Sequence, residues 1–528
     1  MFGLSLAAGG VGANLIVFLI KEFNIKSISA TQISNVLLGC NNLFPIAAAI
    51  IADSFLGSFN VISISAFVSF LGTLLLTFEA TIHTLRPPPC GIGAYTCESP
   101  SKLQLGVLYM ALTLCSLGLG GTRYTIATMG ADQFDKASDQ GKLFNYYFLA
   151  LYIASAISFI GVVYIQDNVG WGLGFGICAM ANAIGLAAFL CGKGIYRQIK
   201  PKGSPFMSIA RVVVAAIRKR KRALTILQDY HHENNGVSKM PINTPSKSFR
   251  FLNRAALKTE NDRGLDGSYS SSWKLCTVKE VEDLKTLVKI SPLWTTGILV
   301  STTIGMFNNL TILQALTMDR HLGPNFKIPA GSFLVFNLLA TAASIILIDR
   351  FLLPTWQNMT HRSLTLLQRI GTGHVINVLT MVGSALIEKR RLHVVQTQNL
   401  SFQLGVTVPM SSLWLVITLI IIGIGEAFHF PGQVALFYQE FPKSLRSTST
   451  AMISLLLAVG FYLTTAITDL LHRFTGWLPN DINKGRLDNV YWMLALLGVI
   501  NLGYFLICAN LFSYQNIDEK QDGPTGLM

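Results

Sequence analysis

Long apolar blocks alternate with short polar segments along almost the whole chain, and one long polar stretch interrupts the series midway. An α-helix needs about twenty apolar residues to cross a bilayer core of roughly 30 Å, and it satisfies its own backbone hydrogen bonds in lipid. The pattern therefore predicts an all-α, multi-pass membrane protein with about twelve transmembrane helices. The expected spans are 2–20, 33–52, 60–82, 104–129, 143–165, 171–191, 291–317, 330–353, 367–387, 411–437, 446–470 and 487–512.

The polar stretch divides the blocks into two sets of six. We expect an N-terminal six-helix bundle over 1–191, a basic cytoplasmic linker with a lateral amphipathic helix over 192–284, a C-terminal six-helix bundle over 285–513 and a cytoplasmic tail over 514–528. A faint repeat supports two equivalent halves, because Ala52-Asp53-Ser54-Phe55-Leu56 after the second block resembles Ile348-Asp349-Arg350-Phe351-Leu352 after the eighth. Transporters commonly carry such repeats, with the substrate site between them near the membrane midplane.

The composition agrees with a membrane protein, since 51% of the residues are hydrophobic and 13% are charged. Soluble domains carry about 25% charged residues. A net charge of +14 would suggest nucleic acid as a partner of a soluble protein. Here the charge is concentrated in the linker, because positions 192 to 283 contain 18 Lys and Arg but only 8 Asp and Glu. Cytoplasmic loops collect Lys and Arg. We therefore expect both termini in the cytoplasm and no nucleic-acid partner.

Within the linker, the mostly apolar run Ile209–Ile217 precedes five consecutive basic residues at 218–222. The plain interpretation is a linker that obeys the positive-inside rule. The alternative is an amphipathic helix that lies on the anionic inner leaflet, with membrane lipids as partners.

Ionisable groups inside apolar spans are costly and usually face a cavity or a partner. Arg123 lies in the fourth expected span and Glu426 near the middle of the tenth, its equivalent in the other half. Arg123 is expected to attract an anionic substrate or to pair with Glu426 as a gate; the alternative is an ion pair with a purely structural role. His429 lies one turn after Glu426 and is either functional or a packed hydrogen-bonding group.

Other polar residues of the spans are weaker candidates. Asn308 and Gln314 in the seventh span, and Tyr152 in the fifth, either line a polar cavity or join helices. Glycines beside both charges, Gly118, Gly120, Gly121, Gly423 and Gly425, either allow close helix packing or permit bending. The chain has no phosphate-binding loop and no metal-ligand spacing, so we expect neither an enzyme nor a cofactor.

Four stretches resemble the plant nitrate/peptide transporter family, the plant branch of the proton-dependent oligopeptide transporters within the major facilitator superfamily. They are Ala52-Asp53-Ser54-Phe55-Leu56-Gly57, Gly130-Ala131-Asp132-Gln133-Phe134, Tyr164-Ile165-Gln166-Asp167-Asn168-Val169-Gly170 and Met318-Asp319-Arg320-His321. The resemblance implies the major facilitator fold, a central substrate site and alternating access between two bundles. Glu426 falls where the family has its tenth-span glutamate.

Two departures from the family pattern affect the expected coupling. The first span of the family carries two glutamates and an arginine implied in proton coupling, and here Met1, Leu4 and Ser5 stand at those positions. A leucine side chain cannot take up and release a proton. In the fourth span, Arg123-Tyr124 stands where the family has Lys-Pro, which keeps the positive charge and loses the proline. The planar arginine fork, always charged, suits an oxyanion such as nitrate.

These departures, together with the stretch 477–492, resemble the nitrate excretion transporters, one plant subgroup. The resemblance implies export of a small anion, nitrate or chloride, across the plasma membrane, weakly or not coupled to protons. The candidate binding or gating residues are Arg123, Glu426, Tyr124, Asn308, Tyr152 and His429. A proton-coupled symporter of chloride, a peptide, a hormone or a glucosinolate-type solute, with Glu426 or His429 as proton carrier, stays open, as does a receptor or scaffold that transports nothing.

Overall fold

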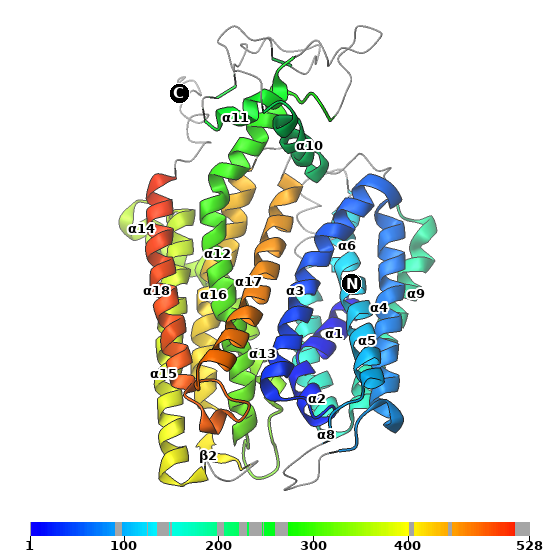
Figure 1. The fold of residues 1–528 in the computed structure, drawn as a ribbon, viewed down its shortest axis with the longest axis vertical. Coiled ribbons are helices and arrows are strands. Elements are labelled where there is room, and N and C mark those ends of the chain that lie inside the picture. The colour runs from blue at the N-terminus through cyan, green and yellow to red at the C-terminus, as the bar shows by residue number, and fades with distance from the viewer. Residues whose placement is uncertain are drawn as a thin grey trace. The chain divides into compact units, whose positions relative to one another are not determined.

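A computed structural model gives the structure, and most of its described residues form membrane-length helices (Figure 1). It describes residues 2–89, 98–123, 125–131, 133–134, 147, 150–197, 205–220, 230–231, 245–246, 248–258, 273–400, 406–441 and 446–512. In these ranges, 11 helices are long and apolar enough to cross a membrane, or up to 12 if one bent helix pair counts as a span. The all-α membrane fold predicted from the apolar blocks is confirmed.

The bent pair is the first expected span. Helix α1 (Phe2–Gly12) and helix α2 (Leu15–Lys21) meet at an angle of 43° around Ala13 and Asn14. The sequence predicted one continuous helix here. The break brings Gly331 of the other half against the carbonyl of Ala13, where a Cβ would lie only 2.6 Å from the carbonyl oxygen.

The remaining described helices of the N-terminal half pack around a common core. Helix α4 packs on α5 and α9, α3 packs on α5, and α1 packs on α9. Their bounds are Ser27–Ile51 for α3, Ser58–Thr81 for α4, Lys102–Arg123 for α5, Thr125–Ala131 for α6, Val163–Asn168 for α8 and Trp171–Cys191 for α9. A membrane-length helix from Ala150 to Asn168 includes α8.

The C-terminal half begins within α12 (Val278–Thr317), a helix of 40 residues. Short strands β1 (Met318–Asp319) and β2 (Val408–Ser411) pair in parallel beyond its end. The other helices are α13 (Leu334–Leu347), α14 (Leu353–Thr360), α15 (Leu366–Thr397), α16 (Trp414–Glu440), α17 (Arg446–Phe474) and α18 (Leu487–Leu511). Three short helical turns lie at Ala330–Phe333, Ile348–Leu352 and Ile482–Lys484.

The internal repeat expected from sequence has a structural counterpart. A π-helical turn follows the second span of each half, at Ala52–Leu56 in the first and at Ile348–Leu352 in the second. Such turns are rare and interrupt the regular hydrogen bonding of an α-helix. Two equivalent interruptions at matching sequence motifs support the division into equivalent halves.

The described chain forms two compact units. The larger unit comprises Met1–Pro201, Thr296–Gln433 and Ser454–Leu506, and the smaller comprises Lys202–Thr295, Val434–Ile453 and Ile507–Met528. The smaller unit contains the linker, with α10 (Pro205–Arg218), α11 (Arg250–Asn253) and a short turn at Arg254–Ala256. These elements bury a small apolar core of their own against the first turns of α12.

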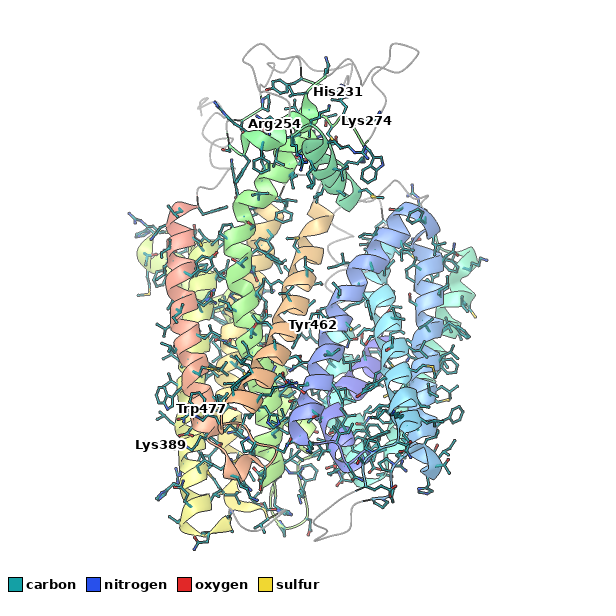
Figure 2. The ribbon with its side chains drawn as sticks, in the orientation of Figure 1. His231, Arg254, Lys274, Lys389, Tyr462 and Trp477 are labelled. Carbon is teal, nitrogen blue, oxygen red and sulfur yellow. The ribbon has the colours of Figure 1, made fainter. Side chains whose placement is uncertain are left out.

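Within the larger unit the two halves touch near the helix ends that the linker does not join. Figure 2 shows Tyr462 where α17 crosses α3. Hydrogen bonds between the halves join Asn309 to Asn35 at 2.6 Å, Gln32 to Asp469 at 3.3 Å, Cys40 to Tyr462 at 3.3 Å and Ser332 to the carbonyl of Phe159 at 2.6 Å. Asp167 of the first half forms an ion pair with Lys21 of that half and lies 3.9 Å from Arg320 of the second. We call this set of contacts the outer closure, because we expect the end opposite the basic linker to face away from the cytoplasm.

Candidate functional site

A cavity of about 350 Å³ lies between the halves inside the larger unit, next to the outer closure. Its wall comes from α1, α3, α5 and the helix containing Ser155 in the N-terminal half, and from α12, α13 and α17 in the C-terminal half. The polar residues among its described lining are Ser5, Ser34, Asn41, Asn42, Thr122, Arg123, Ser155, Asn308 and Asn309. A pocket of this size is at the small end of the range for ligand sites.

Arg123 brings a positive charge to this cavity. It is the last residue of α5 and is half-buried, and its Nη1 lies 3.4 Å from Oδ1 of Asn42 on α3. Asn42 is itself oriented, since its Nδ2 donates to the carbonyl of Leu38 at 2.8 Å. The backbone carbonyl of Arg123 accepts a hydrogen bond from the Tyr147 hydroxyl. The backbone of Arg123 is thus held by Tyr147, and its guanidinium contacts the amide oxygen of Asn42.

The glycines before Arg123 let α5 approach its neighbours. A Cβ at Gly118 would lie 2.5 Å from the Cα of Ser69 on α4, and one at Gly120 would lie 2.5 Å from the Cβ of Phe44 on α3. Both contacts are impossible for a larger residue without moving a helix. Close packing therefore accounts for these glycines, which was one of the two expected readings.

The charge balance of the cavity favours an anion. Among its described lining residues, Arg123 is charged and positive, and the others are amides, hydroxyls, glycines or apolar groups. A guanidinium away from bulk water attracts an anion more strongly than it would in solution, because the effective dielectric constant is lower. Its planar fork can donate two parallel hydrogen bonds to an oxyanion.

Leu4 and Ser5 both line the cavity, at positions where the resemblance noted above implied a glutamate and an arginine. Both residues lie on α1 and are more than nine-tenths buried. The cavity wall at these positions therefore has an apolar group and a hydroxyl group, and a leucine side chain cannot exchange protons.

Glu426 is held away from Arg123. Its half-buried carboxylate accepts a hydrogen bond from Nδ2 of Asn337 on α13 at 3.2 Å, and it is not among the described cavity residues. Gly423, one turn earlier on the same face of α16, packs against the carbonyl of Asn337. This face of α16 therefore abuts α13, and the expected pair with Arg123 does not form in this structure.

His429 lies in the interior of the C-terminal half. Its ring meets that of His374 on α15 edge to face, with centroids 5.0 Å apart, and His374 stacks on Phe505 at 4.7 Å. Both histidines are buried, and neither ring nitrogen of His429 has a hydrogen-bond partner among the described residues. Gly373 allows this approach, since a Cβ there would lie 2.6 Å from that of His429.

The other expected site residues separate into different environments. Asn308 lines the cavity, and its Oδ1 has no partner among the described groups. Tyr152 is half-buried and is not among the described cavity residues, and Tyr124 lies outside the described residues. Gln314 is fully buried in a different network, described next.

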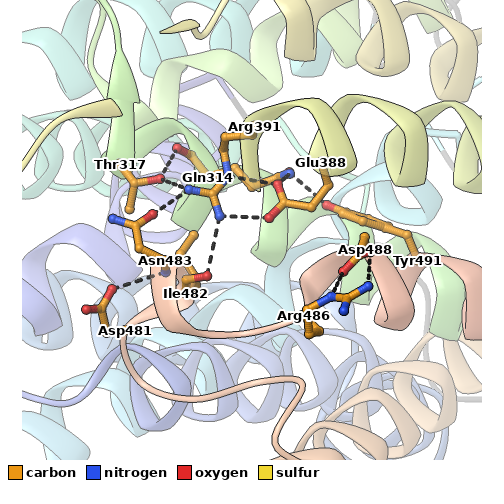
Figure 3. A network of polar contacts seen from close by, with 10 residues as sticks. All are labelled: Gln314, Thr317, Glu388, Arg391, Asp481, Ile482, Asn483, Arg486, Asp488 and Tyr491. Carbon is orange, nitrogen blue, oxygen red and sulfur yellow. Dashed lines mark hydrogen bonds and ion pairs between the residues drawn. The ribbon is translucent and has the colours of Figure 1, made fainter. Parts of the chain in front are cut away.

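That network holds a buried ion pair in the C-terminal half (Figure 3). Arg391 donates through Nη2 and Nε to both carboxylate oxygens of Glu388 at 2.7 and 2.8 Å, and neither side chain is exposed. Gln314 donates to Glu388 at 2.6 Å and accepts from the hydroxyl of Tyr491 at 2.8 Å. Arg391 also donates to the side chains of Thr317 and Asn483. Gln314 therefore joins α12, α15 and α18, which was the structural alternative for this residue.

Sequence reasoning missed three amides of the cavity. They are Asn41, Asn42 and Asn309, and a signal for them exists in the sequence. Each half has an adjacent asparagine pair within an apolar span, Asn41-Asn42 in the second and Asn308-Asn309 in the seventh. All four line the cavity, so a repeated polar pair in two equivalent bundles would have indicated its wall.

The sequence is similar to one protein family over most of its length. The profile of the POT family matches residues 59–484. Among curated proteins of Arabidopsis thaliana, Protein NRT1/ PTR FAMILY 2.7 is 51% identical over 525 residues, covering 99% of this chain and 93% of the relative. Protein NRT1/ PTR FAMILY 2.3 is 49% identical over 534 residues, covering 100% of this chain and 94% of the relative.

Solved structures show the same fold at low sequence identity. An auto-inhibited POT family peptide transporter matches with a TM-score of 0.70 and 14% identity, covering 97% of this chain and 95% of that one. The POT family transporter PepTSo matches with a TM-score of 0.70 and 17% identity, covering 98% and 97%. The major facilitator fold implied by the sequence motifs is therefore confirmed.

Proposed function

Since this chain belongs to the POT family and is thus a membrane transporter and not an enzyme, we propose that it carries a small inorganic anion, nitrate in particular. Alternating access between the two halves would move the anion across the plasma membrane. The direction we propose is outward, with weak or no proton coupling.

The observation that carries this proposal is the cavity at Arg123. Its described lining contributes one guanidinium, several amides and hydroxyls, and no carboxylate. A peptide or another zwitterion carries an ammonium group as well as a carboxylate, and that group needs an acidic or strongly polar acceptor. A small anion needs only the positive charge and a few hydrogen-bond donors. The volume of about 350 Å³ also favours a small solute.

The absence of acids from the described part of α1 supports weak proton coupling. Leu4 and Ser5 occupy the cavity wall there, and Glu426 is bonded to Asn337 outside the described lining. An anion that moves alone carries its charge through the membrane potential. One elementary charge across about 100 mV is worth roughly 2.3 kcal/mol. An inside-negative potential would therefore drive an anion outward without a proton.

The outer closure supports an alternating-access cycle. It joins the halves beside the cavity through α3 on one side and through α12 and α17 on the other. Release of the anion to the outside requires these hydrogen bonds to break and the halves to rock apart. Because the contacts between the halves are single hydrogen bonds and one long ion pair at 3.9 Å, the closure can open at modest cost.

A second candidate function is proton-coupled symport of chloride, a peptide, a hormone or a glucosinolate-type solute. The buried pair His374 and His429, one turn from Glu426, is the observation in its favour. These three groups could hold a proton within the C-terminal half. They do not line the described cavity, which is why we place this candidate second.

Nitrate binding tests the first proposal without any transport assay. A ligand that binds only the folded state raises the melting temperature, and the rise grows with the logarithm of the ligand concentration relative to Kd. Purified protein should be stabilised by nitrate, and Arg123→Gln should lose most of that shift. Arg486→Gln serves as the matched control, because Arg486 is exposed and pairs with Asp488 outside the cavity. Equal nitrate shifts in Arg123→Gln and in the parent protein would contradict the proposed site.

A further inference from the structure

Helix α10 of the linker has one face fixed to the smaller unit. Its side chains Val212, Ala215 and Ala216 are buried in an apolar cluster that includes Val281 and Leu284 of α12. These three positions recur at spacings of three and four residues, which place them on one side of a helix. α10 is therefore held firmly against the first turns of α12.

The opposite face of α10 is apolar and turned outward. Val213 and Ile217 are 39% and 57% exposed, and Ala210 and Val214 lie between them half-buried. The helical spacing puts these four residues on one continuous stripe. Hydrophobic residues on both sides of a linker helix are unexpected in water, because only one side is needed for packing.

Arginines lie along one edge of this stripe and just beyond its C-terminal end. Arg218 and Arg220 are exposed at the end of the helix, and Arg211 is half-exposed beside the first turn. Arg218 also donates to the carbonyl of Trp273, whose ring is 41% exposed. Lys219 in the same basic run is instead buried, and its ammonium donates to the carbonyl of Leu257 at 2.6 Å. Within the basic run, the side chain of Lys219 is thus buried, whereas those of Arg218 and Arg220 are exposed.

α10 packs on a helix that also contains a membrane-length segment. α12 continues without interruption from Val278 to Thr317 and includes a window apolar enough to cross a bilayer. α10 packs on the first turns of this same helix.

We propose that the outward face of α10 binds the anionic lipid surface of the cytoplasmic leaflet. The stripe at Val213 and Ile217 would enter the boundary between headgroups and acyl chains, and the bordering arginines would contact lipid phosphates and carboxylates. An apolar helix face bordered by cations is the pattern of helices that lie in this interface. The cytoplasmic leaflet supplies the matching negative charge. This inference does not depend on which anion the cavity carries.

Hydrogen exchange of the full-length protein in nanodiscs tests the proposal. Amides of 205–218 should exchange about tenfold more slowly in nanodiscs with phosphatidylserine than in nanodiscs of phosphatidylcholine alone, since each surface cation adds to the attraction. Arg218→Gln with Arg220→Gln should remove this difference. Ile217→Asp should remove it as well, by placing a charge on the apolar stripe. Arg473→Gln, outside the linker, should preserve it.

Three outcomes would overturn the proposal. Equal exchange in both kinds of nanodisc would mean that anionic lipid does not cover the helix. Slow exchange that persists in detergent without lipid would mean that another part of the chain or a second protein covers it. Protection by free inorganic phosphate, without phosphatidylserine, would mean that the arginines bind a soluble anion and not a membrane surface.

Discussion

Individual residues set the charge of the cavity. Arg123 contributes the positive charge, Asn42 steers the guanidinium through one long contact, and Leu4 leaves a neutral wall where an acid would change the balance. Because these groups are removed from bulk water, a single added or deleted charge should matter far more than at the surface. Two substitutions test this claim, each by adding a carboxylate to the cavity wall.

Asn42→Asp changes one amide to a carboxylate of the same shape beside Arg123. We expect nitrate affinity to fall at least about thirtyfold, because the new carboxylate would pair with the guanidinium and compete with the substrate. Calorimetric titration with nitrate measures the change. Asn60→Asp is the matched control, since Asn60 is exposed on α4 and, among the described residues, its side chain donates to the carbonyl of Leu56. Unchanged affinity in Asn42→Asp would show that Arg123 is not part of the binding site.

Leu4→Glu introduces an acid into the cavity wall. We expect nitrate flux to fall about tenfold or more at alkaline pH, where the new carboxylate is charged and repels the anion. Flux should recover as the pH falls and the carboxyl group becomes neutral, a dependence that the parent protein should lack. Flux into liposomes as a function of pH measures both effects. Leu4→Gln is the control of equal size, and a pH dependence in that variant would assign the effect to another group.

At the scale of helices, the outer closure connects α3, α12 and α17 beside the cavity. Asp167 forms the ion pairs of the outer closure, since it is paired with Lys21 and lies 3.9 Å from the buried Arg320. Removing the carboxylate leaves the guanidinium of Arg320 without its counter-charge, which is unfavourable for a buried cation. The closed arrangement should lose stability relative to the open one.

Asp167→Asn should therefore open the outer side more often. Cys40 on α3 reports this, because its thiol contacts Tyr462 of the other half. We expect a membrane-impermeant maleimide applied from outside to label Cys40 several-fold faster in the variant, as quantified by mass spectrometry. Asp488→Asn is the control, since Asp488 pairs with Arg486 inside the C-terminal half alone. Identical labelling rates in Asp167→Asn and the parent would rule out a gating role for this ion pair.

Unlike the outer closure, which joins the two halves, the network around Arg391 lies within one half, and its ion pair is fully buried. Arg391→Met leaves the carboxylate of Glu388 without its charged partner, and we expect a loss of about 3–5 kcal/mol in unfolding free energy. Replacing both residues with apolar ones should restore most of that loss, because no buried charge then remains. Thermal unfolding in detergent compares the two variants. A double variant as unstable as the single one would contradict this explanation.

At the scale of the whole molecule, the sequence predicted those features that depend on the length and hydrophobicity of long segments. The spans and the repeated motif of the two halves could be read from the sequence, whereas the π-helical turns at that motif could not. Arg123 and Asn308 were found because polar groups in apolar spans are rare. The neighbours that Glu426 and Gln314 contact could not be predicted, because they depend on how each helix is rotated. That rotation depends on packing partners that are distant in sequence, such as Asn337 and Tyr491. The bend at Asn14 likewise depends on contact with the other half.

In the proposed cycle, voltage drives the movement of the anion. The described cavity wall with its one arginine, and an outer closure of single hydrogen bonds, are what we expect of a carrier in which the anion supplies the moving charge. Proton coupling would require an acid in contact with the cavity, and none is among its described lining residues. The membrane potential is consequently expected to be the principal driving force.

Nitrate flux through the purified protein in sealed liposomes tests this claim most directly. A potassium gradient with an ionophore sets the voltage, and flux is recorded with and without a pH gradient. We predict voltage-driven flux that is indifferent to the pH gradient and that Arg123→Gln abolishes. Flux that requires the pH gradient and is lost in Glu426→Gln would contradict the account and place proton coupling in the C-terminal half.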